Sequence, residues 1–233
     1  MTTPPTSELR RGLVLLCGVA IAAAGLVALT WQAAAPRIEA NVQARAEAGL
    51  AAVLGDTVFD NALAATGYRP QSPAARIAGV EHAWLARRRG EPVGVVLQVA
   101  TTEGYSGRIV LLVGLTPGGE VLGVDTLAHR ETPGLGDFIE TARSDWLMQF
   151  QGRQLGRPPA ERWRVRRDGG EFDAVTGATV TARAVTGALH RALVYFDAEA
   201  QALLAGRDPD HAGGSTDLTT GPDPGLLQPN SNP

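Results

Sequence analysis

Hydrophobic and polar positions divide the chain into an apolar segment, a mixed body and a polar tail. Gly12 to Leu29 contains 18 residues without a charge, and the uncharged stretch continues to Ala35. At about 1.5 Å per residue, 12–35 is long enough for a hydrocarbon core of roughly 30 Å. The pattern therefore predicts a transmembrane helix after a short arm, 1–11. A cleaved secretory signal is the alternative, because two arginines precede the run and three alanines end it, but the run is long for a signal core.

Charges on either side of the apolar segment bear on its orientation. Arg10 and Arg11 on the short arm are matched by Arg37 and Arg45 beyond the segment. The number of arginines is therefore nearly the same on the two sides of the segment. The amino terminus, which lies on the arm, favours a cytoplasmic arm. We therefore expect a single-pass protein of the bacterial inner membrane, with the bulk of the chain on the periplasmic side.

The body begins with helical spacing and continues with strand-like runs. A partial apolar stripe over 38–54 predicts a helix within a membrane-proximal helical segment, 36–79. From about Val80 the pattern changes to short β-like runs at 95–100, 109–115 and 121–127. The sequence Thr-Pro-Gly-Gly at 116–119 is a hairpin signal between the last two runs. This part of the chain predicts an antiparallel sheet.

Helical spacing returns in two later segments. Phe138 to Phe150 is expected to be helical, with a break at Ser144 or Asp145. A final helix is expected from about Thr181, with apolar residues on one face. The predicted fold class is α+β, with one domain at 80–205 that has an antiparallel sheet and flanking helices. The tail, 206–233, contains five Gly, five Pro and four Asp, and this composition predicts disorder.

Composition excludes several kinds of chemistry. All 21 basic residues are Arg, so a Schiff-base lysine and a phosphate-loop lysine are both absent. The net charge of -3 disfavours nucleic-acid binding. The single Cys17 permits neither an intrachain disulfide nor a multi-cysteine metal site. The histidines have no metal-ligand spacing, so no metal site is expected. Redox chemistry in this chain would need an acquired cofactor.

Two motifs carry candidate chemistry. The segment 173–181, Asp-Ala-Val-Thr-Gly-Ala-Thr-Val-Thr, places three hydroxyls and a glycine before the last helix. Free N–H groups at a helix start favour a phosphate, although an ordinary helix cap explains the same residues. The segment 131–136, Glu-Thr-Pro-Gly-Leu-Gly, predicts a tight turn that brings backbone amides close to a flat ligand. A plain loop between strand and helix is its alternative.

The two motifs, in this order and after this apolar segment, resemble the G subunit of the Rnf ion-translocating electron-transport complex. They resemble more distantly the C subunit of the sodium-translocating NADH:quinone reductase. The resemblance extends to Arg-Ile-Glu-Ala-Asn at 37–41, Gly-Tyr-Ser-Gly at 104–107 and Ser-Asp-Trp at 144–146. It implies an FMN-binding domain and a flavoprotein that relays electrons between ferredoxin and NAD, coupled to ion movement. The implied partners are other subunits of the complex, a flavin transferase that installs FMN, and membrane lipid around 12–35.

The resemblance also implies which residues hold the cofactor. In the family, the final Thr of an Asp-x-x-Ser/Thr-Gly-Ala-Thr motif carries FMN through a phosphoester, and this role falls on Thr179. Asp173 is the leading acid, and Thr176, Gly177 and Ala178 shape the turn; Thr176 replaces the usual Ser. The flavin loop then comprises Glu131, Thr132, Pro133, Gly134, Leu135 and Gly136, with Thr132 and Leu135 flanking the ring.

The sequence leaves the roles of three further residues undecided, and it allows three alternative functions. Tyr105 and Trp146 either stack near the flavin or pack in the core, and His129 either tunes the flavin or is an ordinary surface histidine. The chain is expected to be an electron-carrier subunit and not an enzyme on its own, with no catalytic residue. The alternatives are the quinone-reductase subunit, a cofactor-free membrane-tethered module, and a hydrolase that binds a nucleotide reversibly with Asp173 as base.

Overall fold

The computed structural model describes Leu16 and residues 47–206. The expected cytoplasmic arm, the transmembrane helix apart from Leu16, the first part of the 36–79 segment and the tail after Gly206 lie outside the described residues. Among the helices that the structure does describe, none has both the length and the apolar character needed to cross a bilayer.

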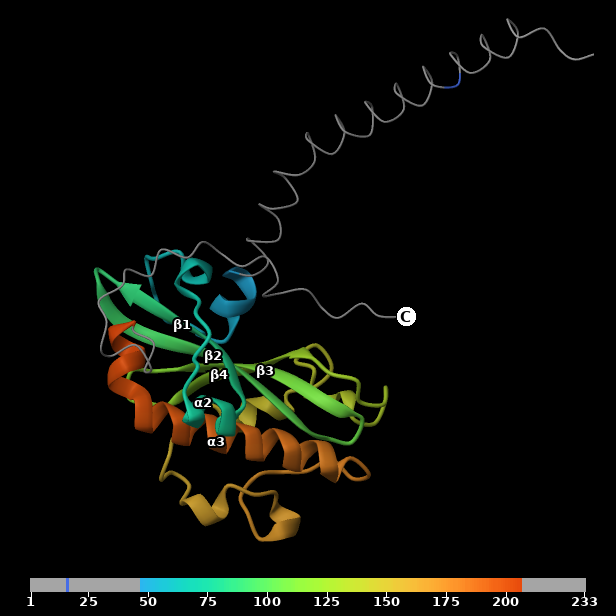
Figure 1. Cartoon of the computed structure of the whole chain (residues 1–233). Helices are drawn as coiled ribbons and strands as arrows, with labels where there is room; N and C mark the ends of the chain where they lie inside the picture. Colours follow the sequence, from blue (N-terminus) through green and yellow to red (C-terminus); the bar gives the residue numbers. More distant parts are fainter. Residues whose placement is uncertain (1–15, 17–46, 207–233) are drawn as a thin grey trace, which may run out of the picture. The chain divides into compact units, whose positions relative to one another are not determined.

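A four-stranded antiparallel sheet forms the centre of the described body (Figure 1). Its strands follow one another in chain order: β1 (Val80–Arg88), β2 (Glu91–Gly104), β3 (Gly107–Leu115) and β4 (Val121–Ala128). Between β3 and β4, the Gly119 N–H donates to the Thr116 carbonyl at 2.9 Å, and Gly119 has a φ of 79°. The predicted hairpin and antiparallel sheet are confirmed, with strands longer than the hydrophobic runs.

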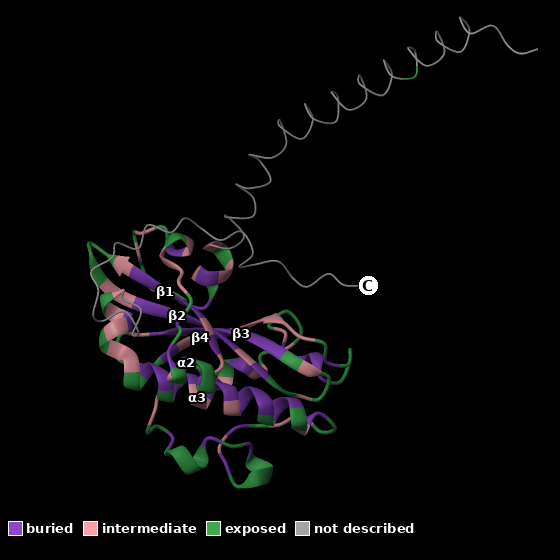
Figure 2. Cartoon of the chain, in the orientation of Figure 1, coloured by how far each residue is buried: buried purple, intermediate pink, exposed green. Residues whose placement is uncertain are grey.

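One face of the sheet packs against helix α3 (Thr179–Ala205) and the shorter helix α2 (Pro73–Ala78). The expected apolar face of α3 is buried in the main core: Ala182, Val185, Leu189, Leu193 and Phe196. Figure 2 shows buried positions along the strands and along α3. Ser72 caps α2 by accepting the Ala75 N–H at 3.1 Å. The predicted last helix is present and begins two residues earlier than expected, at Thr179.

The opposite face of the sheet is covered by residues that precede β1 (Figure 1). Residues 47–52 are helical, and the 3-10 helix η1 (Leu63–Thr66) follows. Leu50, Val53 and Leu54 share a second hydrophobic cluster with Trp84, Val96 and Leu112 of the sheet. A Cβ on Gly114 would lie 2.0 Å from the Val53 carbonyl oxygen, so this close approach requires glycine. Residues from 47 onward thus pack on the sheet, although the sequence pattern separates 36–79 from the domain.

The stretch from Phe138 to Phe150 is interrupted as predicted, and the interruption is wider than expected, over 140–145. It forms two short 3-10 helices, η2 (Asp137–Ile139) and η3 (Trp146–Phe150). Ser144 lies between them; its Oγ donates to the Phe138 carbonyl at 2.6 Å and accepts the Trp146 N–H at 3.1 Å. A serine hydroxyl that bonds nearby backbone groups competes with helical hydrogen bonds, which explains the interruption at the expected position.

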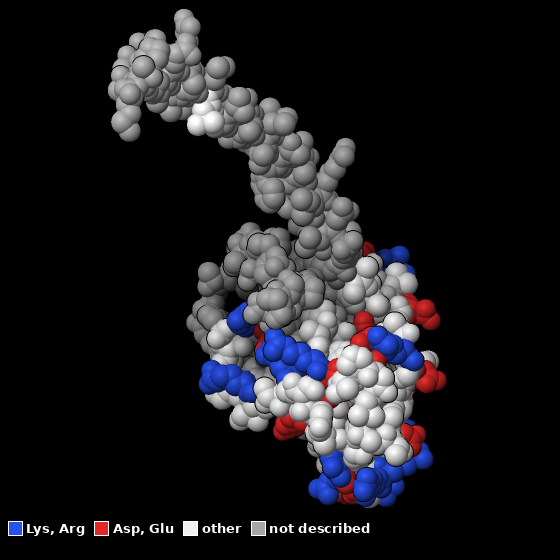
Figure 3. All heavy atoms as spheres, turned by 90° about the vertical axis from the view of Figure 1, so that its right-hand side faces the viewer, with Lys and Arg blue, Asp and Glu red and all other residues white. Residues whose placement is uncertain are grey.

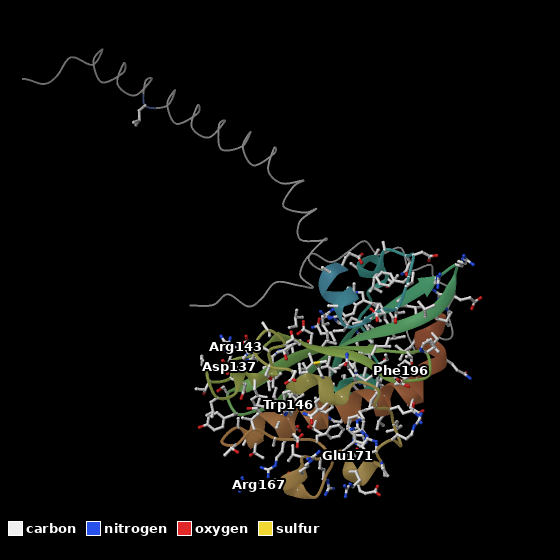
Figure 4. All side chains as sticks on the ribbon, turned by 180° about the vertical axis from the view of Figure 1, so that it is seen from behind. Asp137, Arg143, Trp146, Arg167, Glu171 and Phe196 are labelled. Atoms are coloured by element: carbon white, nitrogen blue, oxygen red, sulfur yellow. The ribbon has the colours of Figure 1, made fainter. Side chains whose placement is uncertain are left out.

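Two segments of the described body are rich in arginine: the end of β1 and residues 153–168. Arg87, near the end of β1, donates to the carbonyls of Leu204 and Ala205 at the end of α3. Residues 153–168 form two further 3-10 helices, η4 (Ala160–Arg162) and η5 (Arg166–Asp168), and Trp163 between them is buried in the main core. Figure 4 shows Arg167 at the outer edge of this segment.

Candidate FMN site

The 131–136 loop follows β4 and closes in a tight turn. The N–H groups of Leu135 and Gly136 both donate to the Thr132 carbonyl, at 3.1 and 2.9 Å. Gly134 has a φ of 76°, a conformation that glycine adopts without steric cost. Leu135, at the tip, is 43% exposed. The turn therefore holds an apolar side chain at the surface of the protein.

The Thr-Gly-Ala-Thr element forms a second turn, which leads directly into α3. The Ala178 N–H donates to the Val175 carbonyl at 3.0 Å, and Gly177 has a φ of 88°. Ala178 is the N-cap of α3 and provides no side-chain hydrogen bond to the first turn. Backbone N–H groups in the first turn of a helix lack helical partners, so they remain available to an anion beside Thr179.

The two turns meet at a pocket of about 100 Å³. A Cβ on Gly177 would lie 3.1 Å from Leu135 Cδ1, so the tip of the flavin loop lies against the second turn. The pocket is lined by Tyr105, Glu131, Thr132, Leu135, Gly136, Gly177, Ala178, Val180 and Thr181. Tyr105, Leu135 and Val180 are exposed apolar side chains on three different segments. Such a group around one pocket suits an apolar ligand.

Glu131 joins the segments that line the pocket. It is 4% exposed, and its carboxylate accepts the Ser106 N–H at 2.9 Å and the hydroxyl proton of Thr181. Thr181 is 1% exposed, in the first turn of α3. A Cβ on Gly136 would lie 2.7 Å from the Glu131 Cβ, so glycine is needed beside this carboxylate. One side chain thus connects the 104–107 turn, the flavin loop and α3.

Glu131 is in turn connected to His129 and Glu140. His129 Nδ1 accepts the Glu131 N–H at 3.1 Å, and His129 Nε2 lies 2.9 Å from Glu140 Oε1. Arg143 Nε donates to the other oxygen of Glu140 at 2.9 Å. The hydrogen bonds from Arg143 and then from His129 hold the pKa of Glu140 below its usual value. With its side chain 12% exposed, His129 is not an ordinary surface histidine.

The structure brings together six of the eleven predicted site residues: Glu131, Thr132, Leu135, Gly136, Gly177 and Ala178 line the pocket. Thr179 is half-buried between Ala178 and Val180, and it does not itself line the pocket. The other four residues, Pro133, Gly134, Thr176 and Asp173, also lie outside the lining. Asp173 is exposed and pairs with Arg166 at 3.2 Å. Asp173 therefore contacts the arginine-rich segment 153–168 and does not line the pocket.

The two aromatic candidates have different surroundings. Tyr105 lines the pocket and is 71% exposed. Trp146 packs edge-on against Phe138 and Phe150, and its ring N–H donates to the Asp173 carbonyl at 3.0 Å. Trp146, labelled in Figure 4, is partly buried and packs against the main core. Tyr105 therefore remains a candidate for contact with the flavin, and Trp146 has a packing role.

Sequence reasoning did not assign Val180 or Thr181 to the pocket. Thr181 did carry a signal, because it lies one helical turn before Val185 on the buried face of α3. A hydroxyl on such a face needs a hydrogen-bond partner, which Glu131 provides. Figure 3 views the end of the body where α3 begins and shows an uncharged area bordered by charged side chains.

Comparison with known proteins places these motifs in a family. Residues 104–194 match the FMN-binding domain, which includes both the flavin loop and the start of α3. The G subunit of the ion-translocating oxidoreductase complex from Pseudomonas aeruginosa is 44% identical over 208 residues, covering 88% of this chain and 94% of that protein. The G subunit of the same complex from Vibrio cholerae is 38% identical over 197 residues, covering 84% and 94%.

Among solved structures, the crystal structure of Shewanella oneidensis NqrC aligns with 65% of this chain and 74% of that chain. The identity is 23% and the TM-score is 0.43. The curated relatives are more similar, and they cover most of both chains. On that coverage and identity, the chain belongs to the family formed by the G subunits of ion-translocating oxidoreductase complexes.

Proposed function

We infer that this chain is the flavoprotein subunit of an Rnf-type complex, in which it relays electrons within a membrane-associated ion-translocating oxidoreductase. The family assignment and the FMN-binding domain support this function. The observation that carries it is the pocket where the flavin loop meets the first turn of α3. Other subunits of the complex are the partners, and the steps on ferredoxin and NAD belong to them.

The pocket residues fit the two ends of FMN. The N-terminus of α3, which no side chain caps, offers N–H groups and a positive helix dipole to the phosphate. The exposed side chains of Tyr105, Leu135 and Val180 offer an apolar surface to the flavin ring. When bound, FMN supplies one- and two-electron redox chemistry, while the protein sets its position and electrostatic surroundings. The Glu131 carboxylate accepts hydrogen bonds from the Ser106 N–H and the Thr181 hydroxyl, and it thereby holds the 104–107 turn and the start of α3 in place beside the flavin loop.

The proposal extends to a covalent phosphoester on Thr179. Three threonines lie near the start of α3, and their surroundings differ. Thr181 is buried and donates its hydroxyl proton to Glu131, while Thr176 lies in the preceding turn. Thr179 is half-buried at the first residue of α3, beside the free N–H groups. These surroundings favour Thr179 as the acceptor, with a flavin transferase as the maturation partner.

A denaturing gel tests covalent attachment directly. The full chain, coexpressed with a flavin transferase, is expected to give a band that fluoresces under ultraviolet light. Expression without the transferase is the matched control and is expected to give no fluorescent band. A reversible nucleotide binder would lose its flavin in both samples, and that result would contradict the covalent part of the proposal.

The proposal places the domain on the periplasmic side of the inner membrane, anchored in lipid by a single span at 12–35. The arm, 1–11, is then cytoplasmic, and 36–79, 80–205 and 206–233 follow as membrane-proximal segment, FMN-binding domain and tail. The hydrophobicity of 12–35 supports the span, and the near-tied arginine count gives weaker support to the orientation.

Reporter fusions test this orientation. Alkaline phosphatase fused after Gly206 is expected to be active, because it folds only outside the cytoplasm, and a cytoplasmic fluorescent reporter at the same site is expected to be dark. A fusion to the arm is expected to give the opposite pair of results. Activity of the cytoplasmic reporter after Gly206 would contradict the periplasmic placement.

A further inference from the structure

His129 occupies a defined place behind the pocket that no part of the FMN-binding proposal uses. Its ring is mostly buried and contacts two groups: Nδ1 lies 3.1 Å from the Glu131 backbone nitrogen, and Nε2 lies 2.9 Å from Glu140 Oε1. A backbone N–H can only donate, so Nδ1 must present its lone pair. The proton of neutral imidazole is then on Nε2, where it is donated to Glu140.

The hydrogen bond to Glu131 lies at the first residue of the flavin loop. The Glu131 side chain enters the pocket lining and accepts from both Ser106 and Thr181. A shift of the Glu131 backbone would therefore move a carboxylate that connects three segments of the pocket wall. His129 fixes that backbone from behind, without lining the pocket.

We propose that neutral His129 is a positioning residue for the flavin: its Nδ1 lone pair holds the Glu131 N–H, and Glu140 fixes the ring in the tautomer that this requires. This inference rests on the proposed FMN site. It differs from a purely structural role because the interaction depends on the protonation state of His129.

Protonation places a second N–H on His129, at Nδ1, where it faces the Glu131 N–H. The hydrogen bond to Glu140 becomes an ion pair, but the acceptor for the Glu131 N–H is lost. The open groove on the His129 side is lined by four further charged side chains: Arg108, Asp125, Arg130 and Glu140. On the pocket side, the charged neighbour is Glu131. Acidification is therefore expected to loosen the flavin loop.

Two amide substitutions separate the two contacts of His129. In His129→Asn, the side-chain oxygen reaches the position of Nδ1, so it keeps the acceptor for Glu131 and loses the contact with Glu140. In His129→Gln, the longer side chain reaches towards Glu140 and leaves the Glu131 N–H without its acceptor. An amide side chain does not take up a proton, so in neither variant can protonation at position 129 change the contact with Glu131.

The experiment uses the full chain in detergent after coexpression with a flavin transferase. Hydrogen exchange at the Glu131 amide and flavin fluorescence are both measured as the pH is lowered. His129→Gln is expected to exchange roughly five-fold faster at Glu131 at neutral pH, which corresponds to one net hydrogen bond of about 1 kcal/mol. The wild type is expected to show an acid step in flavin fluorescence, and His129→Asn is expected to keep the neutral-pH signal without this step.

The contrary results are equally specific. An acid step that persists in His129→Asn, or unchanged Glu131 exchange in His129→Gln, would overturn the role of His129. Intact mass on the same samples reports whether FMN is attached at all. If no variant and no wild-type sample carries FMN, the proposed function fails, while amide exchange at Glu131 still tests the histidine.

Discussion

Replacement of Glu131 by Ala is expected to lower the free energy of unfolding by about 2–4 kcal/mol and to displace the flavin loop. The substitution removes a buried carboxylate and leaves the Ser106 N–H and the Thr181 hydroxyl without their acceptor. In a domain of this size, the loss corresponds to a decrease of roughly 4–16 °C in melting temperature. Circular dichroism of the full chain in detergent measures the melting, and flavin fluorescence reports on the loop.

Two substitutions serve as controls for Glu131→Ala. Glu131→Gln keeps one oxygen for the Ser106 N–H, and its NH₂ group can donate to the Thr181 oxygen, so a smaller loss is expected. Glu103→Ala removes an exposed carboxylate that pairs with Arg191 at 3.2 Å, and such pairs contribute about 0–1 kcal/mol. Equal melting temperatures for Glu131→Ala and Glu103→Ala would contradict the role of Glu131 in joining the pocket wall.

Replacement of Thr179 by Ala is expected to abolish covalent FMN completely, because the phosphoester requires a hydroxyl at that position. The fold should persist, since Thr179 is half-buried and its hydroxyl is not needed as a helix cap. Thr179→Ser keeps the oxygen and loses the methyl group that restricts χ1, so attachment at reduced yield is expected. Intact mass of protein coexpressed with the flavin transferase measures the attached fraction.

The neighbouring threonines provide matched controls for Thr179→Ala. Thr176→Ala removes an exposed hydroxyl in the preceding turn, and attachment is expected to continue. Thr181→Ala removes the donor to Glu131, so at least partial attachment is expected, together with lower stability. If Thr179→Ala protein still carried the FMN mass, another residue would be the acceptor.

Local patterns predicted most of the sheet and the last helix because their signals are short in range. Alternating apolar runs and the Thr-Pro-Gly-Gly turn specify the β3–β4 hairpin, and the apolar face of α3 extends over several helical turns. The 138–150 stretch was harder to predict because its apolar spacing fits a helix, while Ser144 bonds to the backbone on both sides of the break. Periodicity alone does not show which set of hydrogen bonds is more favourable.

Contacts over long sequence separations could not be predicted from such patterns. The sequence identified both flavin motifs, but the Glu131–Thr181 hydrogen bond joins residues 50 positions apart. Only the folded chain shows that Glu131 also reaches Ser106 and that His129 lies behind it. The packing of Val53 against Gly114 is another such contact, because neither residue indicates its partner.

Peptide mapping tests the central claim most directly. Because the chain has arginines and no lysine, trypsin is expected to release residues 168–183 as one peptide that contains Thr176, Thr179 and Thr181. For wild-type protein coexpressed with the flavin transferase, this peptide should gain the mass of FMN minus water, and fragmentation should place that mass on Thr179. An unmodified peptide under these conditions, or a flavin located on any other residue, would contradict the account.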